Sequence, residues 1–279
     1  MKRQTLINLF LLLSVLVLGF FAWFSPVEQE QPKQAPLTGL NSVAIKRIKI
    51  HNNNGPEFEM QRVAGKWQMV KPYPVPANGP RIDILMDLLS TPQVDSFPVP
   101  IERLAEFGLE KPLAVVTFND TQITFGGTHP YNYRRYVRIE NQLYLINDIF
   151  PHHVLARAED FISHALFPEN SQISEIETPE WHIFETDGNW QMTPASQETS
   201  AEALQNKLNS WLHTWVSKVS KAPGEAPSGE IVVQLKGVTE PTRFAIIRNK
   251  TGTLLVREEL GLAYHLTSDN LLQAPVTPD

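Results

Sequence analysis

Polar and apolar residues alternate over many short segments between residues 40 and 273, and two-residue gaps of turn-forming residues separate several of these segments. A period of two puts successive side chains on opposite faces of a strand, so the pattern predicts hairpins. One gap, Asp187-Gly188, is typical of a type I′ turn. The predicted strands are 58–62, 67–69, 115–118, 121–125, 135–139, 142–146, 181–186, 190–192, 231–235, 243–247, 253–257 and 262–266.

Three segments have apolar residues at helical spacing instead. In the first, Asn78 is a candidate N-cap and Pro80 suits the first turn. In the second, Thr199 and Glu202 have the spacing of a capping box. Hairpins with helices on one face predict an α+β fold with mostly antiparallel sheet. The apolar stripes are Ile82, Leu85, Met86 and Leu89; Leu204, Leu208, Trp211, Leu212 and Trp215; and Val154, Ala158, Phe161, Ile162 and Ala165.

One pentapeptide pattern occurs twice, as Gly-Lys-Trp-Gln-Met at 65–69 and as Gly-Asn-Trp-Gln-Met at 188–192, an offset of 123 residues. Further matches follow in the same order at offsets of 119 and 120. Ordered matches at a drifting offset predict an internal duplication, that is, two similar sheet-plus-helix modules. The equivalent positions of Trp67 and Trp190 indicate a role in the core of each module. The predicted modules are residues 40–168 and 169–273.

The first 24 residues have a different pattern, with an uncharged stretch of 19 residues from Leu6 to Phe24. Fourteen of these residues are Leu, Ile, Val or Phe, and about 20 residues are needed to cross a bilayer core. The stretch is therefore predicted to be a single transmembrane anchor. Its apolar positions include Leu6, Leu12, Leu16, Phe20 and Trp23.

Flanking charges predict the orientation of the anchor. Lys2 and Arg3 precede the stretch and Glu28 and Glu30 follow it, which predicts that the N-terminus is in the cytoplasm and the body is outside the membrane. The alternative is a cleaved signal peptide, which needs small residues at positions −3 and −1 before the cleavage site. Phe24 occupies such a position in Ala-Trp-Phe at 22–24, so we expect the anchor to be retained.

Residues 25–39 contain three prolines among Gln and Glu residues and are predicted to form an extended linker. Residues 274–279 contain two prolines and are predicted to form a frayed tail.

Composition narrows the function classes. The chain has 279 residues, no cysteine and a formal charge of −6. Without the two basic residues before the anchor, 22 basic residues remain against 30 acidic ones, so the exported part is acidic. This balance is unlike that of general nucleic-acid binders. Without cysteine there are no disulfides, no thiolate catalysis and no Cys-ligated metal.

Two pairs of titratable residues have helical spacing. Asp83 and Asp87 lie four apart, but the apolar stripe of the same helix leaves them on the solvated face. Asp160 and His164 have the spacing of half a metal site, but no second pair accompanies them. The sequence therefore predicts no catalytic residue, no metal site and no cofactor. A triad assembled from distant residues is the alternative, because it would leave no motif in the sequence.

The segment 126–136, Gly-Gly-Thr-His-Pro-Tyr-Asn-Tyr-Arg-Arg-Tyr, is the strongest candidate for recognition. It joins two predicted strands, and tyrosine and arginine are the residue types that interfaces favour. Tyrosines could also stack on a sugar of the cell wall, or Tyr136 could simply enter the sheet. The candidate interaction residues are His129, Tyr131, Tyr133, Arg134 and Arg135.

The run Ile-Glu-Arg-Leu-Ala-Glu-Phe-Gly-Leu-Glu-Lys-Pro at 101–112 contains a Phe-Gly-Leu-x-x-Pro phrase that leads into a strand. With the strand end at 124–127, the hairpin at 136–145 and the Trp67, Pro72 and Pro74 element upstream, it resembles the bacterial family known as domain of unknown function 4340. The resemblance runs from about 66 to 167, with a degenerate echo to residue 272. The second module has Ala-Pro-Gly-Glu-Ala-Pro at 222–227 in place of the phrase.

The resemblance implies a single-anchor envelope protein with an accessory role, because some relatives accompany ABC-type transport or gliding-motility components. The family has no established catalytic residues to transfer. We therefore expect a non-enzymatic, membrane-anchored protein that contacts a protein partner in the inner membrane or envelope. A binding module for a wall glycan or small ligand is the alternative, and a cryptic hydrolase is a third possibility.

Overall fold

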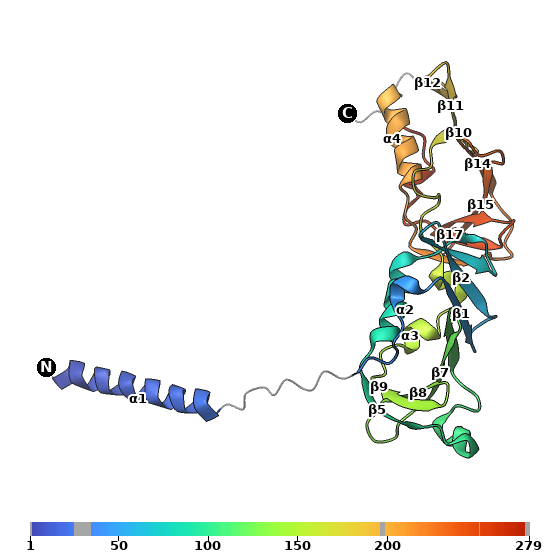
Figure 1. The fold of residues 1–279 in the computed structure, drawn as a ribbon. Helices are drawn as coiled ribbons and strands as arrows, with labels where there is room; N and C mark the ends of the chain where they lie inside the picture. The colour runs from blue at the N-terminus through green and yellow to red at the C-terminus, as the bar shows by residue number, and fades with distance from the viewer. Residues whose placement is uncertain (1, 25–34, 196–198, 251, 277–279) are drawn as a thin grey trace. The chain divides into compact units, whose positions relative to one another are not determined.

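The computed structural model describes residues 2–24, 35–195, 199–250 and 252–276 (Figure 1). The chain divides into two compact units, Met1–Ala35 and Pro36–Asp279, and each is described by itself. The first unit contains helix α1, Lys2–Phe24. The second unit, called the body here, contains all the described strands.

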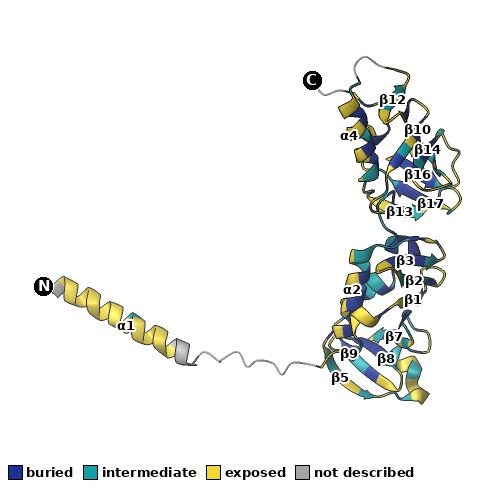
Figure 2. Ribbon diagram, turned by 45° about the horizontal axis from the view of Figure 1, so that its top comes forward, coloured by how far each residue is buried: buried dark blue, intermediate teal, exposed yellow. Residues whose placement is uncertain are grey.

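Helix α1 is apolar along its length. An 18-residue window, Arg3–Phe20, is long and apolar enough to cross a membrane. The side chains of Leu6, Leu12, Leu16 and Phe20 are exposed, and Figure 2 colours the described part of the helix almost entirely as exposed. Trp23 lies in the helix, but its side chain falls outside the described ones.

The body contains a nine-stranded sheet and an eight-stranded sheet, and every neighbouring pair of strands in them is antiparallel. The strands of the first sheet, in spatial order, are β4 (Val75–Pro76), β3 (Lys66–Lys71), β2 (Phe58–Val63), β1 (Arg47–Asn52), β6 (Ala114–Phe118), β7 (Thr121–Thr128), β8 (Arg135–Ile139), β9 (Gln142–Ile146) and β5 (Gln93–Pro98). Those of the second are β12 (Asn189–Thr193), β11 (His182–Thr186), β10 (Ile173–Glu177), β14 (Gly229–Leu235), β15 (Thr242–Asn249), β16 (Gly252–Arg257), β17 (Leu262–His265) and β13 (Lys218–Lys221).

A helix packs on one face of each sheet. In α2, Gly79–Ser90, the Asn78 side chain accepts a hydrogen bond from the Arg81 amide, as the predicted cap requires. The helix contributes Ile82, Leu85 and Leu89 to the main core. The part of the body with the nine-stranded sheet is called the first half here, and the part with the eight-stranded sheet is called the second half. In the second half, helix α4 (Ala201–Leu212) buries Ala203, Leu204, Leu208 and Trp211. The main core continues from one sheet to the other, because residues of both belong to one buried cluster.

Short helical segments complete the body: η1 (Ser42–Ala44), η2 (Ile101–Phe107), α3 (Pro151–Val154), η3 (Ala158–Phe161) and η4 (Asp269–Leu271).

The predicted hairpins are confirmed. The turns at Ala64-Gly65 and Asp187-Gly188 have positive φ at both residues, as type I′ turns require. All twelve predicted strands correspond to observed ones, with ends that differ by up to three residues. Four observed strands, β1, β5, β10 and β13, and the two-residue β4 were not predicted.

The predicted helix over 154–165 is wrong. The structure has the short α3 and η3 there, with extended backbone at Ile162. Asn52 holds the segment open, because its side-chain amide donates to the carbonyl oxygens of Val154 and Ala156 at 2.8 and 2.9 Å. The Ser163 amide likewise donates to the Pro76 carbonyl. Tertiary partners have thus taken backbone groups that a helix would use internally.

Two details of the second predicted helix are also corrected. Its N-cap is Ser200, whose hydroxyl accepts from the Ala203 amide, while the Thr199 hydroxyl donates to the Pro275 carbonyl. Trp215 does not belong to the apolar stripe. It lies beyond the end of α4, bridges Ala165 through its backbone and is 58% exposed.

Candidate functional site

The candidate recognition segment forms a closed loop, residues 129–134, between β7 and β8. The His129 amide donates to the Arg134 carbonyl at 2.7 Å, and the Tyr133 amide donates to the His129 carbonyl at 3.1 Å. The Tyr131 amide donates to His129 Nδ1 at 3.2 Å. These bonds fix the backbone, while the side chains of Tyr131 and Tyr133 are 88% and 77% exposed.

Arg135 lies at the base of the loop and has a different environment. It is 9% exposed, and its Nε and Nη2 donate to the two carboxylate oxygens of Asp148 at 2.8 and 2.6 Å. Its Nη1 donates to the Gly126 carbonyl at 2.8 Å. A bidentate, largely buried pair of this kind fixes geometry. Arg135 therefore joins three segments of the body, and its guanidinium is buried, whereas the rings of Tyr131 and Tyr133 are exposed and the side chains of His129 and Arg134 are half-buried.

The Phe-Gly-Leu phrase packs against this same base. Gly108 ends η2 in the left-handed region, with φ +66°, and a Cβ there would lie 2.6 Å from the amide nitrogen of Gly127. A Cβ on Gly126 would lie 2.3 Å from the Phe107 carbonyl oxygen. Two glycines therefore let the end of η2 lie directly on the backbone of β7.

Aromatic rings join the phrase to the loop. The Phe107 ring meets Tyr136 edge-on, with centroids 4.9 Å apart, and His129 lies 5.7 Å from the same tyrosine. Tyr136 belongs to a second buried cluster with Leu109, Leu143 and Leu145, separate from the main core, and the half-buried Phe107 packs against it. Burial raises the pKa of the Tyr136 hydroxyl. The base of the loop thus packs on a cluster that contains aromatic rings.

The second sheet also has a small buried cluster that is separate from the main core. Its separate buried group consists of Ile247, Leu254, Val256 and Ala263, with Ala222 and Ala245 packed against it. It contains no aromatic ring among the described residues. The aromatic support and the exposed tyrosines therefore belong to the first half of the body.

The loop shares one end of the first sheet with the start of the body. Arg135 and Gln93 are both register partners of Ile146, one on each side of β9. Pro92, immediately before β5, forms a backbone bridge with Pro36. The exposed Ile149 follows β9 at the same end. Pro36 and the loop of residues 129–134, called the tyrosine loop here, therefore lie at the same end of the first sheet.

The sequence profile of the family described as "Domain of unknown function (DUF4340)" matches residues 67–222. The chain belongs to this family. The match includes the Phe-Gly-Leu phrase, the tyrosine loop and Arg135. It also extends past residue 167, where the resemblance read from the motifs ends, to the end of β13. No curated protein sequence and no solved structure matches the chain.

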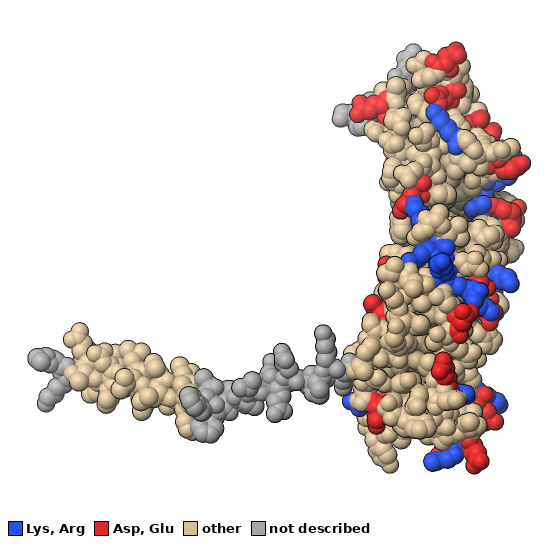
Figure 3. Space-filling view, in the orientation of Figure 1, with Lys and Arg blue, Asp and Glu red and all other residues tan. Residues whose placement is uncertain are grey.

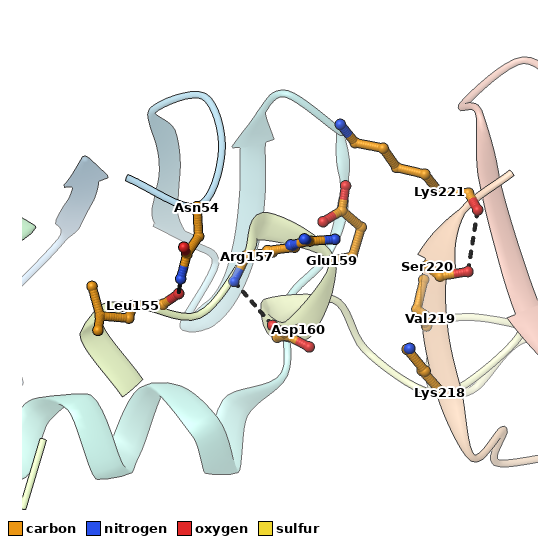
Figure 4. Close-up of a pocket in the computed structure, with 9 residues that line it drawn as sticks. All are labelled: Asn54, Leu155, Arg157, Glu159, Asp160, Lys218, Val219, Ser220 and Lys221. Atoms are coloured by element: carbon orange, nitrogen blue, oxygen red, sulfur yellow. Dashed lines mark hydrogen bonds between the residues drawn. The ribbon is translucent and has the colours of Figure 1, made fainter. Parts of the chain in front are cut away.

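A cleft lies where η3, in the DUF4340 match, meets the edge strand β13 (Figure 4). Its volume is about 520 Å³. Arg157, Glu159 and Asp160 line one side, and Lys218 and Lys221 line the other. Sequence reasoning missed this site because its two sides are some 60 residues apart and no short motif spans them.

The paired carboxylates singled out from the sequence do not form a site. Asp83 and Asp87 are exposed on α2, as predicted for a solvated face. Asp160 and His164 are not on a common helix, because the helix that would pair them is absent, and the Asp160 carboxylate accepts from the Arg157 amide. No group of three or more His, Asp or Glu residues that could hold a metal ion occurs among the described residues.

One serine and one histidine do come together. The Ser220 hydroxyl lies 2.8 Å from Nε2 of His265, and burial, followed by the charge of Lys218, lowers the pKa of this histidine. Figure 4 shows the hydroxyl turned toward the Lys221 carbonyl, to which it also donates, and away from the carboxylates across the cleft. In the described part of the chain no carboxylate lies within ion-pair distance of His265, so the pair lacks the third member of a triad.

Proposed function

We propose that this protein is a non-enzymatic, single-pass accessory protein of the bacterial envelope, and that its tyrosine loop docks onto a protein partner in the inner membrane. In this proposal α1 is an uncleaved anchor, the N-terminus is cytoplasmic and the body is periplasmic. The apolar window of α1 and the basic residues before it support this arrangement.

The exposed tyrosines on a fixed base are the observation that carries the proposal. Large aromatic side chains supply much of the binding energy at interfaces, and they do so at low entropic cost when they are pre-organised. Tyr131 and Tyr133 are almost fully exposed, yet the loop backbone beneath them is hydrogen-bonded and its base is held by Arg135.

The position of the loop supports a partner at the membrane. Residues 25–35 separate the end of α1 from the body, and 11 residues reach at most about 40 Å. Pro36 lies at the same end of the first sheet as the loop. Figure 3 shows basic and acidic residues interspersed over the face that it draws. Since this face has no large patch of a single charge to attract a partner, the proposed contact depends on the tyrosines.

We further propose that the body arose by internal duplication. Without β4, the strand order of the first sheet maps one by one onto that of the second, from β3 and β12 to β5 and β13. Helix α2 comes after β3 and the short β4, and α4 comes after β12. Trp67 and Trp190 each lie two residues after the glycine of the turn between β2 and β3 or between β11 and β12. An experimentally determined structure tests this: residues 44–167 and 173–272 should superpose with the two tryptophans aligned.

A triple variant tests the docking proposal. Tyr131→Ala, Tyr133→Ala and Arg134→Ala together remove two exposed tyrosine side chains and one half-buried arginine. The unfolding free energy should change by no more than about 0.5 kcal/mol for each tyrosine. Capture of partners from native membranes after chemical cross-linking should fall by tenfold or more. Val238→Ala, at an exposed site in the second half, is the control and should leave capture unchanged.

Two results would count against the proposal. One is capture by the folded triple variant equal to that of the wild type. The other is loss of binding to purified wall glycan with unchanged protein capture, which would assign the loop to a sugar.

A further inference from the structure

The cleft between η3 and β13 has walls from the two halves of the body (Figure 4). Residues 157–160 follow the first sheet, and residues 218–221 form the edge strand of the second. A smaller hollow of about 200 Å³ adjoins it and shares Arg157, Glu159 and Lys221. A molecule in this space would touch both halves at once.

Charges of both signs line the cleft without pairing across it. Arg157, Lys218 and Lys221 are exposed, and no carboxylate lies within 4 Å of their charged groups among the described residues. Eight ion pairs of Lys or Arg with a carboxylate occur elsewhere in the described chain, so such pairing is common in this body. The cleft therefore holds cations and carboxylates that are available to another molecule.

Glu159 is the most buried of these charged residues, at 7% exposure. One carboxylate oxygen accepts a hydrogen bond from the Tyr73 hydroxyl at 2.6 Å. Burial, together with Glu159, raises the pKa of Tyr73, so this hydroxyl remains a donor. A buried carboxylate with one neutral donor lacks the compensation that a cation would give. Figure 4 shows the carboxylate turned toward the cleft, below the end of Lys221.

We propose that this cleft binds a small zwitterion, an amino acid or short peptide with free termini, across the two halves of the body. The ammonium group of the ligand pairs with Glu159 and Asp160. Its carboxylate pairs with Lys218, Lys221 and Arg157. Complementarity of charge favours this ligand class over a simple anion, which would meet the two carboxylates as well as the three cations. The site is separate from the tyrosine loop and does not depend on the docking proposal.

Calorimetric titration of the full-length protein in detergent micelles tests the ligand class. The probes are L-alanyl-L-alanine, its N-acetyl form, its C-terminal amide and inorganic phosphate. We expect saturable binding of the free dipeptide and at least tenfold weaker binding of each blocked form, because each has lost one of the two charges. Phosphate binding as strong as that of the dipeptide, equal binding of a blocked form, or no binding of the dipeptide would overturn the proposal.

Variants locate the site. Lys218→Gln with Lys221→Gln should weaken dipeptide binding at least tenfold, and Glu159→Gln should do the same while keeping an acceptor for Tyr73. Lys250→Gln, at an exposed turn of the second half, removes a like charge and should have no effect. Thermal unfolding shows that each variant is folded. Undiminished binding by the folded double lysine variant would place the ligand elsewhere and contradict the proposal, even if Glu159→Gln fails to fold.

Discussion

Neighbouring residues of the tyrosine loop have opposite environments. Tyr131 and Tyr133 are exposed on a hydrogen-bonded backbone, whereas Arg135 is buried against Asp148 and Gly126. The sequence placed all three in one candidate set, because residue type alone indicates interface preference. It could not separate them, because the partner of Arg135 lies 13 residues away across a hairpin.

This difference predicts different costs of substitution. Arg135→Ala leaves Asp148 without its cation, so we expect a loss of about 3 kcal/mol in the free energy of unfolding. Tyr131→Ala should cost no more than about 0.5 kcal/mol. Urea unfolding curves measure both. Replacing the pair by Met and Leu together should recover part of the loss, and equal costs for Arg135 and Tyr131 would contradict the assignment.

His265 predicts a dependence of stability on pH. Burial, followed by Lys218, lowers its pKa in the folded protein, whereas the unfolded chain binds a proton near pH 6.5. The contribution of His265 to the free energy of unfolding is therefore complete above pH 6.5. It is lost as the pH falls from 6.5 through the lower pKa that this histidine has in the folded protein. Between about pH 7.5 and pH 5, the melting temperature should fall less for His265→Gln than for the wild type. An equal fall in both proteins would show that this residue does not contribute.

At the scale of elements, local patterns predicted hairpins well and short connecting segments poorly. The turns at 64–65 and 187–188 have residues that suit positive φ, so local chemistry decides them. The segment 154–165 has helical spacing of apolar residues, but Asn52 and Pro76 take its backbone groups. Strand β1 was predictable, because Ile48 and Ile50 alternate with polar residues.

The contact between η2 and β7 provides a matched pair of substitutions. A Cβ on Gly126 would lie 2.3 Å from the Phe107 carbonyl, whereas the nearest atom to a Cβ on Gly127 would be 3.6 Å away. Gly126→Ala should therefore cost about 2–3 kcal/mol by forcing the phrase off the sheet, as other overpacked sites do. Gly127→Ala should cost much less. Thermal unfolding of the two variants compares them directly, and similar melting temperatures would show that the phrase adapts.

At the scale of the whole molecule, the sequence predicted an N-terminal apolar helix and an antiparallel α+β body, and the structure has both. The family was also recognisable from the Phe-Gly-Leu phrase taken together with the strand, hairpin and Trp-Pro motifs around it. The cleft between the halves could not be predicted, since it depends on how η3 meets β13 and not on any local pattern.

Two measurements test the orientation of the proposed anchor and its retention in the mature protein. Alkaline phosphatase fused to the C-terminus should be active, because the body is proposed to lie outside the inner membrane. Mass spectrometry of the mature chain should recover residues 1–24 on the membrane-bound protein. A soluble product that begins near residue 25 would show that the chain is cleaved and would contradict the proposal of a retained anchor.

The central claim, that the tyrosine loop meets a protein partner at the membrane, is tested most directly by site-specific photo-cross-linking in native membranes. A photoreactive phenylalanine analogue at position 131 replaces an exposed ring, and the same analogue at Val238 provides the control. The account predicts one discrete cross-linked protein from position 131 and none from position 238. Absence of a discrete product at position 131, or the same product from both positions, would contradict it.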